Sequence, residues 1–235
     1  MDVTIIVPTY NEAENIPVLI ERIFGAVEPE GFECEVIVVD DNSPDGTTES
    51  ARGLEDSYKN LTVICRKGKR GLSSAVIDGI EAAGGEIIGF MDADLSHHPE
   101  SIPELVGAIT FGDCDIAIGS RFTEGGDAGE MPPLRRVFSW IAAHTARGLT
   151  GVRDPMSGFF FFRKGVIDGI ELSPRGFKIG LDILVKGRYR KVAEVPISFG
   201  KRGYGRSKMS ADVIKEDLLN LIKLYIKGIL SHVSK

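Results

Sequence analysis

The sequence lacks three features, and each absence argues against a class of protein. No run of about 18 uninterrupted apolar residues occurs, so no transmembrane helix is predicted. The cysteines Cys34, Cys65 and Cys114 form no CxxC pair, which favours reduced side chains in a cytosolic protein. No GxGxxG follows the first strand-like segment and no GxxxxGK[ST] occurs anywhere, which argues against a dinucleotide or Walker-type site.

The first half of the chain alternates strand-length apolar runs with helical patterns. With 235 residues, 43% of them hydrophobic, the chain can form one large domain or two small ones around a sizeable core. Continuous Val/Ile runs indicate strands that are covered on both faces. The alternation therefore predicts an α/β fold with a doubly wound, mostly parallel sheet. The predicted strands are 3–9, 34–41, 61–67, 86–92 and 114–122, and the predicted helices are 12–27, 47–57, 72–84 and 99–110.

The pattern changes after Phe122, and the C-terminal part of the chain has a different charge. From Lys186 to Lys235 there are 12 Lys and Arg against 4 Asp and Glu, whereas the preceding 185 residues carry 16 against 30. A basic end on an acidic protein suggests either an anionic partner or simply a solvated basic face. After an acidic Gly-rich loop at 123–133, the predicted elements are an amphipathic helix at 134–151, a strand within 157–166, a helix at 177–188, a strand at 191–199, a basic Gly-rich loop at 200–208 and a long helix at 211–230.

Unusual polar groups follow three of the predicted strands. Each group alone has a plain explanation, such as a helix cap or a turn. Ligands of open parallel sheets bind beyond the carboxyl ends of the strands, so the three groups together predict a shared active cleft. The groups are Pro8, Tyr10, Asn11 and Glu12 after the first strand, Asp40, Asp41, Ser43 and Asp45 after the second, and Asp92 and Asp94 after the fourth.

The stretch "GFMDADLSHHPE" permits three interpretations: a zinc site using His97 and His98, a hard-cation site using Asp92 and Asp94, or a polar loop without chemistry. Adjacent histidines in an extended loop point in different directions, which is a poor start for zinc. An Asp-x-Asp pair at a strand end suits Mg²⁺ or Mn²⁺, because these ions bind both carboxylate and phosphate oxygens. Through such an ion, an acidic cleft could hold a nucleotide diphosphate.

Six ordered segments carry a resemblance to a known family: "VPTYNEAENI", "VIVVDDNSPDGT", "GFMDADLSHHPE", "IGSRF", "DPMSGF" and "EVPISFGKRGYGRSK". Together they resemble family 2 glycosyltransferases of the GT-A fold, and more narrowly the dolichyl-phosphate mannose synthases. The resemblance implies inverting transfer of mannose from GDP-mannose to dolichyl (polyprenyl) phosphate with release of GDP. It places a catalytic domain at 1–210, followed by an amphipathic helix at 211–235.

The resemblance also implies roles for individual residues. The acceptor phosphate is already an anion near neutral pH, so no catalytic base is predicted. The implied sites are the nucleotide pocket (Pro8, Tyr10, Glu12, Asp40, Asp41, Asp92 and Ala93), the Mg²⁺ or Mn²⁺ site (Asp92, Asp94 and, as a weaker ligand, Ser96), the acceptor-phosphate site (Arg121, Arg135 and Ser139), the loop closing over the diphosphate (Arg202, Ser207 and Lys208), and the catalytic groups (Asp94, Arg202 and Lys208).

Three alternatives stay open at this point. First, the same fold could use UDP-glucose as the sugar donor. Second, the chain could be a sugar-phosphate nucleotidyltransferase, although the glycine-rich signature of that class is missing. Third, it could be a non-enzymatic membrane adaptor. The helices at 134–151 and 211–230 are expected to lie on the cytoplasmic face of a membrane, making the protein peripheral. There are two alternatives to this direct attachment. The last helix could pack on the domain, or a small membrane subunit could serve as the anchor. No nucleic-acid partner is expected.

Overall fold

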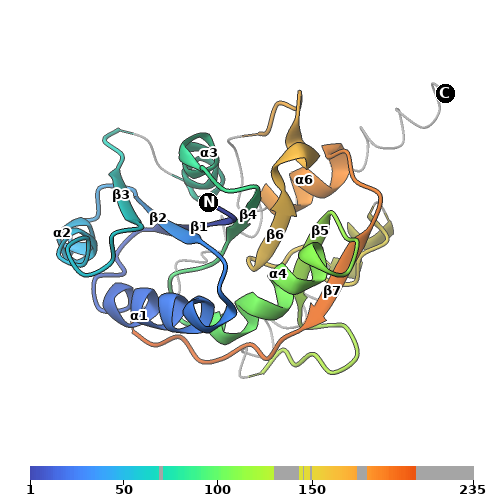
Figure 1. The fold of residues 1–235 in the computed structure, drawn as a ribbon, viewed down its shortest axis with the longest axis horizontal. Coiled ribbons are helices and arrows are strands. Elements are labelled where there is room, and N and C mark those ends of the chain that lie inside the picture. Colours follow the sequence, from blue (N-terminus) through green and yellow to red (C-terminus); the bar gives the residue numbers. More distant parts are fainter. Residues whose placement is uncertain (69–70, 130–142, 145, 149, 174–178, 205–235) are drawn as a thin grey trace.

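The computed structural model describes residues 1–68, 71–129, 143–144, 146–148, 150–173 and 179–204 (Figure 1). Seven strands form one sheet in the order β3-β2-β1-β4-β6-β5-β7. β6 runs antiparallel to both neighbours and every other pair is parallel, which confirms the predicted mostly parallel α/β sheet. The strands are β1 (Val3–Thr9), β2 (Cys34–Asp40), β3 (Leu61–Cys65), β4 (Ile87–Phe90), β5 (Ile116–Ser120), β6 (Phe160–Arg163) and β7 (Val192–Pro196).

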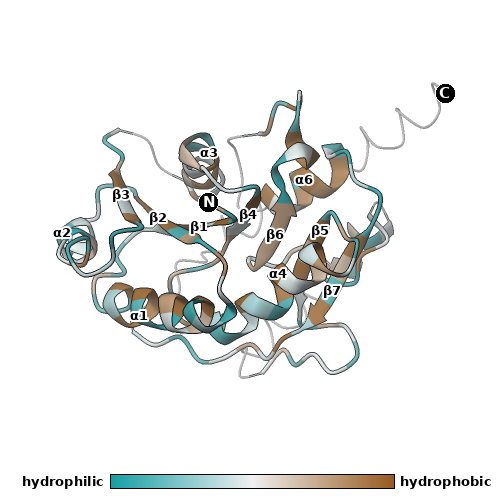
Figure 2. Ribbon diagram, in the orientation of Figure 1, coloured by the Kyte–Doolittle hydropathy of each residue, from teal (hydrophilic) through white to brown (hydrophobic). Residues whose placement is uncertain are grey.

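Helices cover both faces of the sheet. Figure 1 shows α1 (Ile16–Val27) and α4 (Ile102–Thr110) on one side, and α3 (Leu72–Ala82) and α6 (Ile179–Lys186) on the other. Successive side chains of a strand point to opposite faces, so Ile5 joins the core under α1 whereas Ile6 joins the core under α3. Figure 2 shows hydrophobic colour along the central strands and mixed colour on the helices, as expected for helices with one buried face. The shorter elements are α2 (Thr47–Arg52), η1 (Glu28–Glu30), η2 (Pro99–Ser101) and η3 (Lys164–Ile167).

The insertion of β6 into the sheet depends on an aromatic run and a glycine. Phe159 to Phe162 are all fully buried and alternate between the two cores. Gly89 of β4 lies directly opposite Phe161, and a Cβ at position 89 would lie 2.2 Å from the Phe161 ring. The missing side chain at Gly89 therefore makes room for the ring of the antiparallel neighbour.

Within the described residues the predicted strands and helices are present, mostly with shorter bounds. The helix predicted at 12–27 begins at Ile16, because residues 12–15 form a turn in which the Glu12 carbonyl accepts the N–H groups of Asn15 and Ile16 at 3.0 Å. None of the helices within the described ranges is long and apolar enough to cross a membrane. The predicted helix at 211–230, most of the predicted helix at 134–151 and the proposed boundary at residue 210 lie outside the described residues.

Candidate active site

The polar groups that follow β1, β2 and β4 meet at one edge of the sheet. These strands are direct neighbours, and their parallel direction brings their carboxyl ends together. The loops after β1 and β2 are joined, because the Asn11 N–H donates to Ser43 Oγ at 2.9 Å. At each strand end, one non-glycine residue has a positive φ: Asn11 at 55°, Asn42 at 53° and Leu95 at 64°. Such a backbone is costly for leucine, so its surroundings must hold it in place.

Arg202 connects two of the predicted site residues. Its Nη2 lies 2.7 Å from Asp94 Oδ2, and its Nη1 lies 3.4 Å from Glu12 Oε1. Asn15 donates its side-chain N–H to the other Glu12 oxygen at 2.6 Å. Glu12, predicted for the nucleotide pocket, Asp94 of the Asp-x-Asp motif and Arg202, predicted for the closing loop, therefore lie within one ion-pair cluster although they are far apart in the chain.

The loop of residues 200–204 is attached by its backbone to the segment that follows β4. The Gly200 N–H donates to the Ser96 carbonyl at 2.9 Å, and the Gly203 N–H donates to the Asp94 carbonyl at 3.0 Å. A Cβ at position 203 would lie 2.7 Å from the Leu95 side chain, so glycine permits this close approach. The described part of the basic loop thus lies over the Asp-x-Asp motif, whereas Ser207 and Lys208 lie outside the described residues.

The Asp-x-Asp carboxylates have different surroundings. Asp94 is buried, and its Oδ1 accepts the Ser96 N–H at 3.0 Å and also the Ser96 hydroxyl. The Asp92 side chain is 38% exposed, and its Oδ2 lies 3.5 Å from Nε2 of the buried His97. Ser96, expected as a weak metal ligand, is therefore a hydrogen-bond donor to Asp94 in this structure.

The donor chemistry of this pair fits a hard divalent cation. Carboxylate oxygens are ligands that Mg²⁺ and Mn²⁺ accept. Because the guanidinium of Arg202 lies against Asp94, it would have to move away from this carboxylate when a cation binds. Within the described residues, no three His, Cys, Asp or Glu side chains form a metal-binding group. A cation held by Asp92 and Asp94 would therefore take its remaining ligands from phosphate oxygens and water, as Mg²⁺ commonly does.

The two histidines pack against protein groups. The His97 ring lies 5.3 Å from the ring of Phe159 and 5.3 Å from that of Phe199, measured between centroids. His98 Nδ1 lies 3.2 Å from Nη2 of Arg22. Both contacts agree with the prediction that the histidines are structural.

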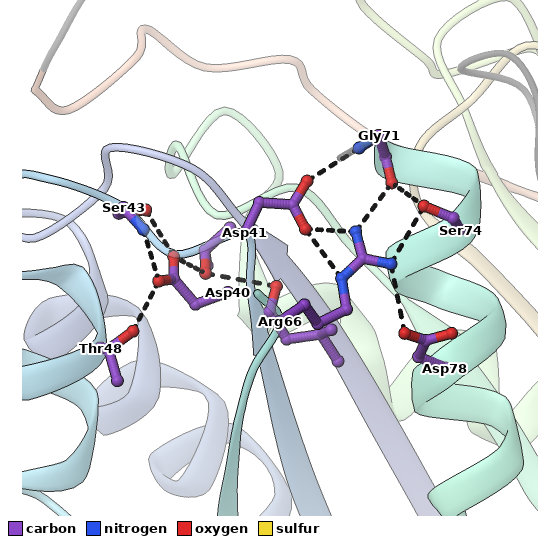
Figure 3. Close-up of polar contacts among 10 residues, drawn as sticks. Asp40, Asp41, Ser43, Thr48, Arg66, Gly71, Ser74 and Asp78 are labelled. Atoms are coloured by element: carbon purple, nitrogen blue, oxygen red, sulfur yellow. Dashed lines mark hydrogen bonds and ion pairs between the residues drawn. The ribbon is translucent and has the colours of Figure 1, made fainter. Parts of the chain in front are cut away.

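Asp40 is surrounded by donors from the protein itself. Its Oδ1 accepts the Thr9 hydroxyl at 3.0 Å and the Ser43 hydroxyl, and its Oδ2 accepts the Ser43 N–H at 2.9 Å and the Thr48 hydroxyl at 2.6 Å (Figure 3). A carboxylate has about four lone-pair positions, so these donors occupy its capacity. Asp40 therefore holds the β2–α2 loop, and a nucleotide would have to replace one of these donors to bind it.

Asp41 forms a buried ion pair with Arg66, which follows β3. Asp41 Oδ1 accepts from Nε of Arg66 at 2.8 Å and also from its Nη2, while Asp41 Oδ2 accepts the Gly71 N–H at 2.8 Å (Figure 3). Arg66 Nη1 donates to Ser74 Oγ at 3.0 Å and lies 3.3 Å from Asp78 Oδ2 on α3. The sequence reasoning missed Arg66, although an arginine directly after an apolar strand and before a Gly-rich turn was a visible signal.

Arg121, predicted to bind the acceptor phosphate, is paired with a buried acid. Its Nε and Nη2 donate to the two oxygens of Asp154, each at 2.8 Å. Asp154 belongs to the "DPMSGF" segment, for which the sequence predicted no individual residue role. Arg135 and Ser139 lie outside the described residues. Of the other predicted nucleotide residues, Pro8 and Tyr10 are half-buried and Ala93 is buried.

Hydrogen bonds lower the pKa of one carboxyl at this edge. Burial alone would raise the pKa of Asp45, but hydrogen bonds from Thr47 and from the Ala13 N–H outweigh it and hold the pKa below its ordinary value. Asp45 thus stays ionised and ties the turn after β1 to the start of α2.

The family model for "Glycosyl transferase family 2" matches residues 4–170. The chain belongs to glycosyl transferase family 2. Its membership confirms the predicted family and enzyme class, a glycosyltransferase. A dolichol-phosphate mannosyltransferase of Pyrococcus furiosus is 46% identical, with 95% of this chain aligned, and this chain spans 64% of that protein's length. The protein of the same name from Saccharomyces cerevisiae is 40% identical, covering 96% of this chain and 88% of its own length.

Other similar proteins vary in lipid and in sugar. An undecaprenyl-phosphate mannosyltransferase of Micrococcus luteus is 35% identical, over 95% of this chain and 93% of its own. The structure of a Mycobacterium tuberculosis glucosyl-3-phosphoglycerate synthase with Mn²⁺, UDP-glucose and phosphoglyceric acid has a TM-score of 0.67 at 19% identity, covering 95% of this chain and 79% of that one. A Pyrobaculum calidifontis mannosyltransferase structure with GDP-Man and Mn²⁺ has a TM-score of 0.61 at 23% identity, covering 86% of this chain and 58% of that one. These structures confirm the fold.

Proposed function

We propose that this glycosyltransferase moves mannose from GDP-mannose to a polyprenyl phosphate such as dolichyl phosphate, with inversion at the anomeric carbon and release of GDP. The observation that carries the proposal is the Arg202 cluster, which joins Glu12, Asp94 and the 200–204 loop at one edge of the sheet. The names of three relatives that align with nearly the whole chain support mannose as the sugar and a polyprenyl phosphate as the acceptor.

On the donor side, Asp92 and Asp94 would hold Mg²⁺ or Mn²⁺, which supplies positive charge to the diphosphate when bound. Mn²⁺ is present in the structures of two similar proteins, which supports a divalent ion. Arg202 lies beside Asp94 and can turn from the carboxylates to the departing diphosphate as negative charge develops there. We assign the same task to Lys208, and Ser207 would donate a hydrogen bond.

The nucleotide itself would lie along the ends of β1 and β2, against Pro8, Tyr10, Glu12 and Ala93. Hydrogen-bond donors of the protein itself already occupy the acceptor positions of Asp40 and three acceptor positions of Asp41. We therefore assign both acids to shaping this pocket. Their hydrogen-bonded loops would then present backbone groups to the base and ribose.

On the acceptor side, Arg121, Arg135 and Ser139 would hold the lipid phosphate. The phosphate oxygen needs no deprotonation near neutral pH, so the protein's task is to align it with C1 of mannose. We place this reaction at the cytoplasmic face of a membrane, with the enzyme bound peripherally through residues 134–151 and 211–230. A small membrane subunit is the alternative anchor.

The test is transfer of radiolabelled sugar into an organic-extractable lipid phosphate, with GDP-mannose and UDP-glucose assayed separately in Mg²⁺ and in Mn²⁺. Product from GDP-mannose alone supports the proposal. Product from UDP-glucose alone would replace it with a polyprenyl phosphate glucose synthase. A nucleoside diphosphate sugar formed from sugar phosphate and nucleoside triphosphate would instead indicate a nucleotidyltransferase, and the family match argues against that outcome.

A further inference from the structure

Asp154 is a fully buried acid that fixes both the side chain and the backbone of Arg121. Its Oδ2 accepts from Arg121 Nε at 2.8 Å and from the Arg121 backbone N–H at 3.0 Å, and its Oδ1 accepts from Nη2 at 2.8 Å. Two parallel N–H···O bonds between a guanidinium and a carboxylate define the plane and direction of the arginine fork. The orientation of Arg121 is therefore set by Asp154.

Two aromatic rings hold the same guanidinium from other sides. The Arg121 Cζ lies 5.3 Å from the ring centroid of Phe122 and 5.5 Å from that of Phe199. No hydrogen bond joins Nη1 of Arg121 to another described residue, so this part of the fork is the one left for a ligand. An arginine that is already oriented loses little rotamer freedom when an anion binds to it.

The segment that carries Asp154 also reaches the donor side. A Cβ on Gly158 would lie 2.8 Å from Asp92 Oδ2, so the segment passes directly beside the Asp-x-Asp motif. The Ser157 hydroxyl donates to the Gly119 carbonyl at 2.7 Å and ties the segment to β5. Residues 154–158 therefore contact an acid of the donor side at one end and the acceptor-side arginine at the other.

Glu194 of β7 holds the start of this segment. Its Oε1 accepts the Asp154 N–H at 3.0 Å, and its Oε2 accepts the Arg153 N–H at 2.9 Å. The buried carboxylate is thus anchored through its own backbone as well as through Arg121.

We propose that Asp154 is a positioning residue that directs Arg121 at the acceptor phosphate and so sets where the attacking oxygen lies relative to the donor. The proposal rests on the function proposed above, in which Arg121 binds that phosphate. A displacement of about 1 Å at the reacting atoms can reduce the rate about 10²-fold. A purely structural ion pair would instead lower stability and affect donor and acceptor alike.

The kinetic test compares Asp154→Asn with Asp41→Asn. Asn has the size of Asp but loses the charge, and Asp41 is a matched control because it is also a buried acid paired with an arginine, on the nucleotide side. Asp154→Asn should raise the KM for a short polyprenyl phosphate at least about tenfold while the Kd for GDP changes less than about twofold. Asp41→Asn should show no such selectivity. An unchanged acceptor KM in Asp154→Asn, or an equal loss of GDP affinity, would overturn the proposal.

A second measurement does not depend on turnover. In protein labelled with ¹⁵N-arginine, the Nε–H signal of Arg121, identified with Arg121→Lys, should shift as citronellyl phosphate is added, whereas that of Arg66 should not. Asp154→Asn should need at least about tenfold more of this ligand. If the Arg121 signal in the native protein does not move, the inference fails even when mannose is transferred. If it moves but no mannose is transferred, only the proposed function fails.

Should Asp154→Asn not fold, Glu194→Gln takes its place. This change weakens the hydrogen bonds to the Arg153 and Asp154 backbone while leaving the Arg121 pair in place. It should raise the acceptor KM by a larger factor than the Kd for GDP. An equal increase in the acceptor KM and in the Kd for GDP would count against the proposal.

Discussion

Replacing Arg66 with methionine would test whether the paired acids after β2 serve the fold or the ligand. The Arg66 side chain is 3% exposed, and its partners Asp41 and Asp78 are 8% and 22% exposed. Arg66→Met removes the charge and all five hydrogen-bonding N–H groups but keeps most of the apolar volume. Asp41 would then keep the Gly71 N–H as its remaining donor among the contacts described above.

The size of the effect follows from the burial of this pair. Removing one partner of a buried ion pair costs about 3–5 kcal/mol, because the other charge stays buried without compensation. For a chain of this length, about 1 kcal/mol shifts the Tm by about 2–4 °C, so Arg66→Met should lower it by roughly 6–20 °C. Urea denaturation measures the free energy of unfolding, and titration calorimetry below the transition measures GDP affinity.

The control is Lys59→Met, which breaks the exposed pair between Lys59 and Asp56 and should change stability too little to measure. The reasoning is refuted if Arg66→Met lowers the unfolding free energy by less than about 1 kcal/mol, the range of surface pairs. Reduced GDP affinity at unchanged stability would also refute it, since Asp41 would then act mainly on the ligand.

Three further predictions concern the metal motif, the core and acid stability. Asp94→Asn should abolish most transfer and keep the native circular dichroism spectrum, and full activity in excess EDTA would contradict the metal role. Gly89→Ala should destabilise the protein by about 1–3 kcal/mol in urea denaturation, because the new methyl group overlaps the Phe161 ring; an unchanged midpoint would contradict it. Because the pKa of Asp45 is lowered on folding, its stabilisation is present above its unfolded pKa of about 3.9 and disappears as pH falls through the folded pKa. Asp45→Asn should therefore flatten the decline in thermal midpoint below about pH 4, and parallel curves would contradict this.

Local patterns in the chain were sufficient to predict where the strands lie in the sequence and which residues form one edge of the site. The Val/Ile run of β1 and the polar residues directly after it depend only on neighbouring positions, so their spacing predicted both the strand and the place of Glu12. The pair Asp92 and Asp94 was visible for the same reason. The place of β6 was not, because the pattern of an apolar strand contains neither its direction nor its neighbours.

The amino-acid sequence by itself determined which residue types stand at the strand ends, since that depends on the order of residues alone. Only the tertiary structure decided which of them meet. Arg121 and Asp154 are 33 positions apart and Arg202 and Glu12 are 190 apart. Such pairs form only when the sheet brings distant loops together. A buried carboxylate is stable only when donors surround it, and those donors come from different elements, as Thr9 and Thr48 do for Asp40. The sequence therefore identified where the acids stand in the chain. The packing of the sheet and its loops determined that Asp40, Asp41 and Asp154 bind the protein's own groups.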